Sequence, residues 1–230
     1  MISLSYVYHA LLDLLYPPDV KCVICQGREE VKRGVGICTG CYGKLSLIPH
    51  AFIHRYAMED LSCTKIFSVC LYTTLAKDLI HRYKYKGEKH LGVNLGWMMY
   101  QRVMEYLTKD DIDYVTAVPL YPSRERQRGF NQSKLLAVRI GYLLNKPVYH
   151  NLIFRIKDTP TQTTLTREQR WVNVSDAFKA SRSLDLTGKN ILLVDDVYTT
   201  GATLNSCGKS IVRAGAARVY GITFAAGTGY

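Results

Sequence analysis

The segment from Asn190 to Thr203 (NILLVDDVYTTGAT) restricts the possible folds of this chain more than any other part of its sequence. Its first residues, NILLV, form an apolar run that is typical of a strand buried on both faces. Two adjacent carboxylates, Asp195 and Asp196, follow this run, and Gly201 then leads into a helix expected over residues 202–214. A strand that turns directly into a helix is the building unit of a parallel sheet covered by helices.

From residue 65 onward, the chain alternates short apolar runs with amphipathic ones. We expect the other strands over residues 66–72, 114–120, 148–152 and 218–224, and the other helices over residues 75–85, 91–107 and 132–144. Residues 156–176 are polar, rich in Thr and weakly periodic, which is typical of a long loop or lid. The pattern predicts an α/β fold with a parallel sheet and flanking helices, in which ligands bind beyond the carboxyl ends of the strands.

The turn after the acidic pair has the chemistry of a phosphate site. Backbone N–H groups at the start of a helix lack partners within the helix, and the helix dipole adds partial positive charge there. Thr199, Thr200 and Thr203 add hydroxyl donors, and Gly201 permits close approach of the backbone. Carboxylates beside a phosphate repel it, unless a sugar donates its vicinal hydroxyls to them while its 5′-phosphate lies in the turn. The segment therefore predicts a site for a phosphorylated ribose. A plain strand, turn and helix with a capping Asp is the alternative.

Four cysteines near the N-terminus have the spacing of a metal site. Cys22 and Cys25 are separated from Cys38 and Cys41 by twelve residues, in the pattern C-x2-C-x12-C-x2-C. Two such pairs place four thiolates at the corners of a tetrahedron, which is the geometry of a closed structural zinc site. The alternative is two disulfides in a secreted protein, which we disfavour because we expect no export signal. The remaining cysteines are expected to be buried packing residues: Cys63, Cys70 and Cys207.

The charge balance indicates an anionic partner. The chain has 30 Lys and Arg residues against 19 Asp and Glu, a formal net charge of +11, which favours a nucleotide, a nucleic acid or an acidic membrane surface. No apolar run is long enough to span a bilayer. We expect an amphipathic helix over residues 1–20, a four-cysteine zinc ribbon over 21–50 and the α/β domain over 60–230, in a cytoplasmic protein.

Arg124, Arg126 and Arg128 follow an expected strand, at the edge of the sheet where ligands bind. They can hold a pyrophosphate by bidentate hydrogen bonds, with Mg²⁺ offsetting the remaining negative charge. A solvated basic turn is the alternative. In the polar segment, three residues are candidates to close over the ligand as a lid: Gln162, Arg167 and Arg170.

A second basic segment alternates cations with tyrosines: Arg82, Tyr83, Lys84, Tyr85 and Lys86. Aromatic rings stack on unpaired bases while Lys and Arg follow the phosphates, so this run is a candidate for binding single-stranded DNA. The alternative is the C-terminal end of an amphipathic helix, where cations are favourable.

Residues 194–203 (VDDVYTTGAT) resemble the PRPP loop of type I phosphoribosyltransferases. The resemblance implies that Asp195 and Asp196 hold the ribose hydroxyls. It also implies that the following residues hold the 5′-phosphate: Val197, Tyr198, Thr199, Thr200, Gly201, Ala202 and Thr203. By the same resemblance, the three arginines of 124–128 belong to the pyrophosphate-binding loop.

Together with the four-cysteine ribbon, several short motifs make the chain similar to the ComF family of competence proteins, best to the ComFC type. These motifs are YKYKG at 83–87, RGFNQ at 128–132, EQR at 168–170 and Asn173. The similarity runs from about residue 15 to the C-terminus and implies a type I phosphoribosyltransferase-like fold. It also implies a role in natural transformation, in which the protein handles incoming single-stranded DNA with a ComFA-like helicase, in the cytoplasm or at the inner face of the membrane.

Two functions remain open from the sequence. As an enzyme, the protein would displace pyrophosphate from PRPP by a nucleophile at C1 of the ribose, in nucleotide salvage or related metabolism. As a binding module, it would sense PRPP or a nucleotide, or serve as a scaffold, while DNA and a helicase occupy its basic surface. The acceptor and the oligomeric state are not readable from the sequence.

Overall fold

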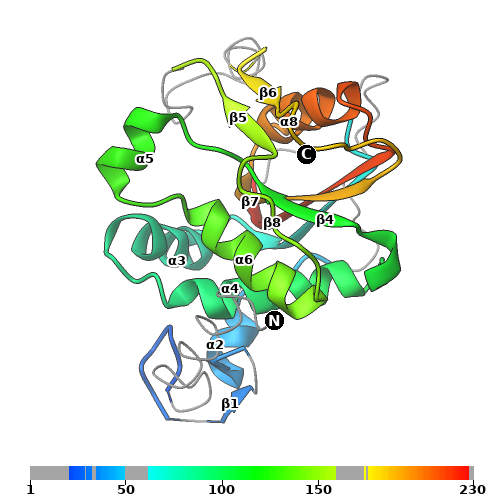
Figure 1. The fold of residues 1–230 in the computed structure, drawn as a ribbon. Helices are drawn as coiled ribbons and strands as arrows, with labels where there is room; N and C mark the ends of the chain where they lie inside the picture. Colours follow the sequence, from blue (N-terminus) through cyan, green and yellow to red (C-terminus); the bar gives the residue numbers. More distant parts are fainter. Residues whose placement is uncertain are drawn as a thin grey trace, which may run out of the picture.

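The computed structural model describes residues 21–28, 30–32, 35–49, 62–158, 174 and 176–227. The described residues form a four-stranded sheet, helices on both of its faces, a two-stranded hairpin and a ribbon near the N-terminus (Figure 1). The helix expected over residues 1–20 lies outside the described residues. The predicted lid residues Gln162, Arg167 and Arg170 lie outside them as well.

The sheet consists of four parallel strands in the order β3-β8-β7-β4. Their bounds are Lys65–Leu71 for β3, Tyr114–Ala117 for β4, Asn190–Tyr198 for β7 and Arg218–Ala226 for β8. In β7, Ile191 and Leu193 pack into the core on one face, and Leu192 and Val194 pack into the core on the other. Both faces of this central strand are therefore buried, as its apolar run predicts.

Helices cover the two faces of the sheet unequally. On one face lie α3 (Thr74–Tyr85), α4 (Leu91–Met104) and α6 (Gln132–Leu144), and on the other lies α8 (Ala202–Arg213) (Figure 1). A short 3-10 helix, η1 (Lys109–Asp111), precedes β4. The predicted fold class, a parallel sheet with flanking helices, is confirmed. Within the described ranges, no helix combines the length and the apolar character that crossing a bilayer would require.

The segment between β4 and α6 contains a helix that the sequence pattern did not predict. β4 ends at Ala117, three residues before the end of the expected strand, because Pro119 has no N–H to donate to the ladder. The chain then forms α5 (Pro122–Arg128), which begins with Pro at its first position and ends at Gly129, with φ of +80°. The arginines of this segment are therefore carried by a helix rather than by an extended loop.

The strand expected over residues 148–152 is wrong. Val148 makes only an isolated parallel bridge to Val115 of β4, after which the chain turns away from the sheet. The strand comes directly afterwards, as β5 (Ile153–Arg155), and pairs antiparallel with β6 (Phe178–Ala180). Residues in this segment are apolar because they are buried, but burial alone does not show whether a residue belongs to the sheet. Leu152 and Ile153 are buried in the core that also contains Phe178 of β6.

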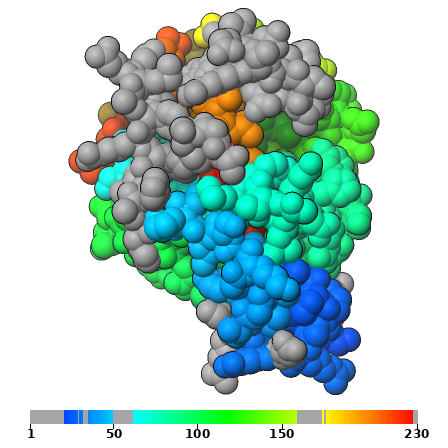
Figure 2. Space-filling model, turned by 180° about the vertical axis from the view of Figure 1, so that it is seen from behind, coloured from blue at the N-terminus to red at the C-terminus, as the bar shows by residue number. Residues whose placement is uncertain are grey.

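The N-terminal ribbon packs against the helical face of the α/β core. It contains two short antiparallel strands and one helix: β1 (Val31–Lys32), β2 (Ile37–Cys38) and α2 (Thr39–Lys44). Two side chains fasten it, because Arg82 donates to the carbonyl of Val23 at 2.9 Å and Asn94 donates to that of Val35 at 2.8 Å. Figure 2 shows the ribbon, in blue, at one end of the molecule.

Candidate functional site

The acidic pair lies near the carboxyl end of β7, and residues 197–201 lead from it to the first turn of α8. Between the two elements the chain turns at Gly201, which has φ of +79° and begins the helix. A Cβ atom at this position would lie 2.5 Å from the hydroxyl oxygen of Tyr198. Both the backbone angle and the close ring therefore require glycine, and the turn is held in one conformation.

A cavity of about 510 Å³ opens at this end of the sheet, within the size range of small-molecule sites. Of the residues predicted to bind the ribose and its phosphate, the following line it: Asp195, Asp196, Val197, Tyr198, Thr199, Gly201 and Thr203. Thr200 and Ala202 are buried and do not line this cavity. The remaining walls come from α3, α5, α6, β5, Tyr72 and the residues that follow β4.

Lys84 of α3 forms an ion pair with Asp196 inside this cavity. Its Nζ lies 2.8 Å from Oδ1 and 2.7 Å from Oδ2 of the carboxylate, and the Asp196 side chain is only 6% exposed. Burial disfavours the charge of Lys84, but the attraction of Asp196 and Asp195 outweighs it and raises the pKa of the amine. The sequence indicated Lys84 for a different role, so this contact is new.

Asp195 has a different environment from its neighbour. Its Oδ1 accepts from the hydroxyl of Ser133 at 2.8 Å and from the backbone N–H of Asp196 at 2.9 Å. Burial, followed by the charge of Asp196, raises its pKa from 3.8 to about 7, although Lys84 and these hydrogen bonds oppose the shift. Asp195 therefore exchanges a proton near neutral pH.

Three arginines line the same cavity as the acidic pair. Arg124 and Arg128, one helical turn apart on α5, both line it, whereas Arg126 is exposed and is not among its lining residues. Arg155 of β5 also lines it, and the sequence pattern gave no signal for this residue. Burial, reinforced by the charge of Arg124, lowers the pKa of Arg155. An anion placed between these guanidinium groups would relieve both the burial penalty and their repulsion.

Arg128 is held in position by two neighbours. It donates a hydrogen bond to the side-chain oxygen of Gln132, and a second one to the hydroxyl of Tyr85 at 3.0 Å. Its guanidinium carbon also lies 4.9 Å from the centroid of the Tyr85 ring. Arg128 is therefore oriented before any ligand arrives, which lowers the entropy cost of binding one.

The residues of the run predicted to bind single-stranded DNA point in different directions, because successive side chains of a helix are rotated by about 100°. Tyr83 is fully buried and donates to a backbone carbonyl at the start of α6, and Arg82 forms an ion pair with a nearby glutamate at 2.6 Å. Lys84 is engaged by Asp196, which leaves Tyr85 and Lys86 as the exposed members of the run. DNA binding by this run stays a prediction, and it concerns these two residues above all.

The four cysteines of the ribbon come together as predicted. The sulfur atoms of Cys22, Cys25, Cys38 and Cys41 all lie within 4.8 Å of one another, and those of Cys25 and Cys38 lie 3.8 Å apart. Tetrahedral zinc with bonds of about 2.3 Å separates its sulfur ligands by about 3.8 Å, so the cluster fits zinc. Backbone N–H groups donate to three of the sulfurs at 3.4 Å, which stabilises thiolates. The other three cysteines are buried, as expected: Cys63, Cys70 and Cys207.

Comparison with known proteins identifies relatives over most of the chain. The DNA utilization protein YhgH of Escherichia coli O157:H7 is 30% identical over 201 residues, which cover 86% of this chain and 86% of that protein. The competence protein ComFC of Bacillus subtilis is 29% identical over 213 residues, which cover 90% of this chain and 83% of that protein. The chain belongs to the ComF family of competence proteins.

Another ComF relative, competence protein F of Haemophilus influenzae, is 27% identical over 213 residues, which cover 86% of this chain and 93% of that protein. No protein-family model matches the chain. The resemblance to the ComF family predicted from short motifs is therefore confirmed by full-length relatives.

Solved structures similar to this ComF protein include a purine phosphoribosyltransferase from Pyrococcus horikoshii Ot3. The TM-score is 0.34 at 18% identity, covering 58% of this chain and 80% of that one. Protein AQ2163 from Aquifex aeolicus gives a TM-score of 0.37 at 15% identity, covering 70% of this chain and 86% of that one. These scores are low, and membership of the family rests on the sequence relatives.

Proposed function

We propose that this ComF protein binds PRPP, or another ribose 5-phosphate derivative, in the cavity around Asp195 and Asp196, and that it serves the use of incoming DNA. The observation that carries the first part is the composition of the cavity. Two carboxylates and the first turn of α8 line it, together with Arg124, Arg128 and Arg155. A ligand that combines vicinal hydroxyls with separate phosphate groups matches this combination of acids, helix start and cations.

The residues would divide the ligand among them. The vicinal hydroxyls of the ribose donate to the carboxylates, and the 5′-phosphate accepts from backbone N–H groups and threonine hydroxyls of residues 199–203. The pyrophosphate lies against the cations of α5 and β5. The carboxylate oxygens of the pair are ligands of the kind that Mg²⁺ takes, and Mg²⁺ bound with PRPP would offset the charge of the pyrophosphate.

Lys84 sets a condition on this binding mode, because it contacts both oxygens of Asp196. Each carboxylate oxygen has two lone pairs, so a ribose hydroxyl can share Asp196 with the amine. The amine also keeps the adjacent carboxylates from repelling a phosphate ligand. Lys84 therefore acts as a positioning residue for the acidic pair in this proposal.

Isothermal titration calorimetry with PRPP and Mg²⁺ tests the binding site. We expect the substitution Asp196→Asn to weaken binding at least about tenfold, because it removes a charge-assisted acceptor for the ribose hydroxyls, worth roughly 1.5–3 kcal/mol. Asp110→Asn is the matched control, since it removes the same charge at an exposed position of η1. Absence of a heat signal for the wild-type protein, or equal losses in the two variants, would contradict the proposal.

An active phosphoribosyltransferase is the second candidate. It is favoured by Asp195, whose pKa of about 7 places its proton exchange in the range where general bases act. The reaction would break the bond between C1 and the pyrophosphate oxygen and form a bond from C1 to the nucleophile. Release of pyrophosphate from PRPP, measured with a panel of nucleobases, tests this activity. If no nucleobase of the panel causes release of pyrophosphate at saturating PRPP, the enzyme function is refuted and only the binding function stands.

The role in DNA use is supported by the names of the relatives, which are competence and DNA utilization proteins. We infer that the protein handles single-stranded DNA in natural transformation, with a ComFA-like helicase as partner. Fluorescence anisotropy with a labelled poly-dT oligonucleotide tests DNA binding, and we expect the affinity to fall steeply with salt concentration. Binding that does not change with salt would contradict an electrostatic contact.

A further inference from the structure

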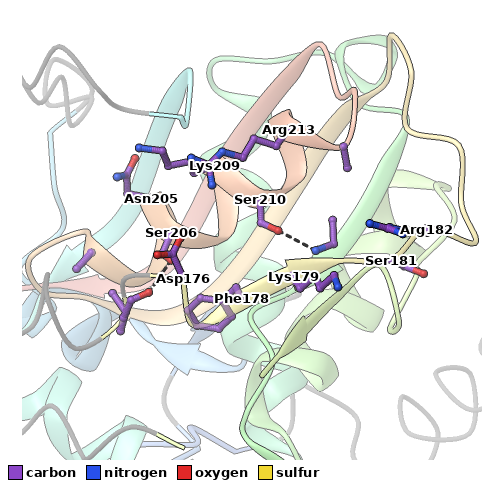
Figure 3. Close-up of a pocket in the computed structure, with 14 residues that line it drawn as sticks. Asp176, Phe178, Lys179, Ser181, Arg182, Asn205, Ser206, Lys209, Ser210 and Arg213 are labelled. Atoms are coloured by element: carbon purple, nitrogen blue, oxygen red, sulfur yellow. Dashed lines mark hydrogen bonds between the residues drawn. The ribbon is translucent and has the colours of Figure 1, made fainter. Parts of the chain in front are cut away.

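A second cavity, of about 670 Å³, lies next to α8, the helix that covers one face of the sheet. The helices α3, α4 and α6 cover the other face. One wall is α8, and the other is β6 with the residues that follow it (Figure 3). Two hydrogen bonds fix the walls. The N–H of Ala180 donates to the hydroxyl oxygen of Ser210 at 2.7 Å, and the hydroxyl of Ser206 donates to the carbonyl of Val174 at 2.7 Å. The cavity is therefore built by ordered elements.

Cations line both walls of this second cavity. Lys179 and Arg182 come from the β6 side, and Lys209 and Arg213, four residues apart, come from one face of α8 (Figure 3). Against these four cations, the lining residues include one carboxylate, Asp176. Cations that line one cavity with so few acids repel one another, and a bound anion relieves that repulsion.

Three of these cations lack an ion-pair partner among the described residues: Lys179, Arg182 and Arg213. These three cations alone carry more positive charge than a single phosphate group carries in negative charge. The ligand they match is one with several linked phosphates.

We propose that this second cavity binds a small ligand with two or more linked phosphates, such as a nucleoside triphosphate or tripolyphosphate. Its phosphates lie between the two walls, with Arg182 on one side and Arg213 on the other. The cavity volume suits a ligand of nucleotide size.

A single strand of nucleic acid fits these residues less well. Binding of single strands without sequence preference uses open aromatic rings on which bases stack. Phe178 is the one aromatic residue among the described residues that line the second cavity, and it is only 6% exposed. The guanidinium carbon of Arg155 also lies 5.5 Å from the centroid of its ring. The second cavity therefore offers cations for phosphate groups but no open ring for a base, which favours a compact polyphosphate over a single strand.

The second cavity is distinct from the ribose site, although both contact the beginning of α8. Thr203 lines the ribose site and Ala202 lines the second cavity. None of the four cations of the second cavity is among the residues that line the ribose site. The proposal therefore goes beyond the proposed function, and either one can fail without the other.

Calorimetry with sodium tripolyphosphate tests the proposal. The titration uses full-length protein that carries Arg124→Gln and Arg128→Gln, which weakens the cation cluster of the ribose site and leaves the second cavity intact. We expect tripolyphosphate to bind this protein. Adding Arg182→Gln and Arg213→Gln should weaken that binding about tenfold or more, through loss of two charge-assisted contacts.

The matched control is Lys109→Gln with Arg218→Gln, which removes the same charge from two exposed positions outside both cavities. We expect this pair to change the affinity less than about twofold, because exposed distant charges are screened. A second pair of cavity substitutions, Lys179→Gln with Lys209→Gln, should weaken tripolyphosphate binding as the arginine pair does. Thermal unfolding of each variant shows whether the protein remains folded.

Three results would overturn the proposal: no binding of tripolyphosphate, equal weakening by the control pair, or unchanged affinity in both pairs of cavity variants. A poly-dT oligonucleotide is titrated in parallel. If the cavity substitutions abolish oligonucleotide binding while tripolyphosphate does not bind, the cavity is a nucleic-acid contact and the polyphosphate assignment is wrong.

Discussion

Substituting Lys84 by Met tests whether the ion pair in the ribose site sustains the acidic pair. The Lys84 amine contacts both oxygens of Asp196, whose side chain is 6% exposed, and the second carboxyl group, Asp195, lies next to it in the sequence. Met keeps most of the side-chain volume and removes the charge. Removing one partner of a buried ion pair costs about 3–5 kcal/mol, because the other charge stays buried without compensation.

The acidic pair gives this loss a pH dependence with a definite sign. A buried carboxyl group with a raised pKa binds more protons in the folded protein than in the unfolded chain, so stability falls as pH rises through the folded pKa. In the wild-type protein this applies to Asp195, over the pH range between its ordinary pKa of 3.8 and its folded pKa of about 7. The charge of Lys84 lowers the pKa of Asp195, so without Lys84 this pKa rises further and the fall in stability extends to higher pH. Each pH unit then changes the contribution of Asp195 by about 1.4 kcal/mol.

The measurement is urea unfolding at about pH 5.5 and at about pH 8, a range over which the proton-binding difference amounts to as much as about 3 kcal/mol. Lys84 itself adds no slope here, since its pKa lies above 10.5. Lys77→Met is the matched control, because Lys77 is exposed on the same helix and lines the same cavity. We expect the Lys77 variant to stay within about 0.5 kcal/mol of wild type. Equal losses in the two variants, or a Lys84→Met loss that is the same at both pH values, would refute the reasoning.

Two further predictions concern the metal cluster and the turn before α8. Substituting Cys38 by Ser should remove most of the zinc from protein purified without chelator, whereas Cys63→Ser should retain about one zinc per chain by metal analysis. Retention of zinc in Cys38→Ser would contradict the site. Substituting Gly201 by Ala should lower stability by more than about 1–3 kcal/mol, because the backbone strain adds to a clash with Tyr198. Gly188→Ala is the control for backbone strain alone, since Gly188 has φ of +69° and open space around it. Similar losses of stability in the two variants would exclude a contribution from the clash with Tyr198.

Some parts of this structure follow closely from local sequence. The limits of α6, residues 132–144, are those expected, because Asn131 caps the helix and a residue with positive φ ends it. β7 and α8 begin where they were expected, and α8 ends within one residue of its expected end, but β7 runs four residues beyond the apolar run, to Tyr198, and so contains the acidic pair. In these segments, local propensity and tertiary burial favour the same structure.

The partners of the acidic pair could not be predicted, because they come from distant parts of the chain. Lys84 lies 112 residues from Asp196 in the sequence, and Ser133 lies 62 residues from Asp195. Arg155 reaches the cavity from β5, whereas the apolar pattern predicted a strand of the parallel sheet over residues 148–152. Charge and periodicity indicate that a residue is basic and helical, but the neighbour it meets depends on the order of the strands.

Three successive residues of α3 point to three different parts of the molecule. Arg82 holds the cysteine ribbon, Tyr83 donates to the backbone of Gln132 at the start of α6, and Lys84 holds Asp196. About 100° of rotation separates each side chain from the next along a helix. One short helix thus contacts the ribbon, the start of α6 and the acidic pair. A metal held by the four cysteines would steady the anchorage of the same helix that supplies the amine to Asp196. If the proposed metal and ribose sites are both used, their occupancies should influence each other through α3.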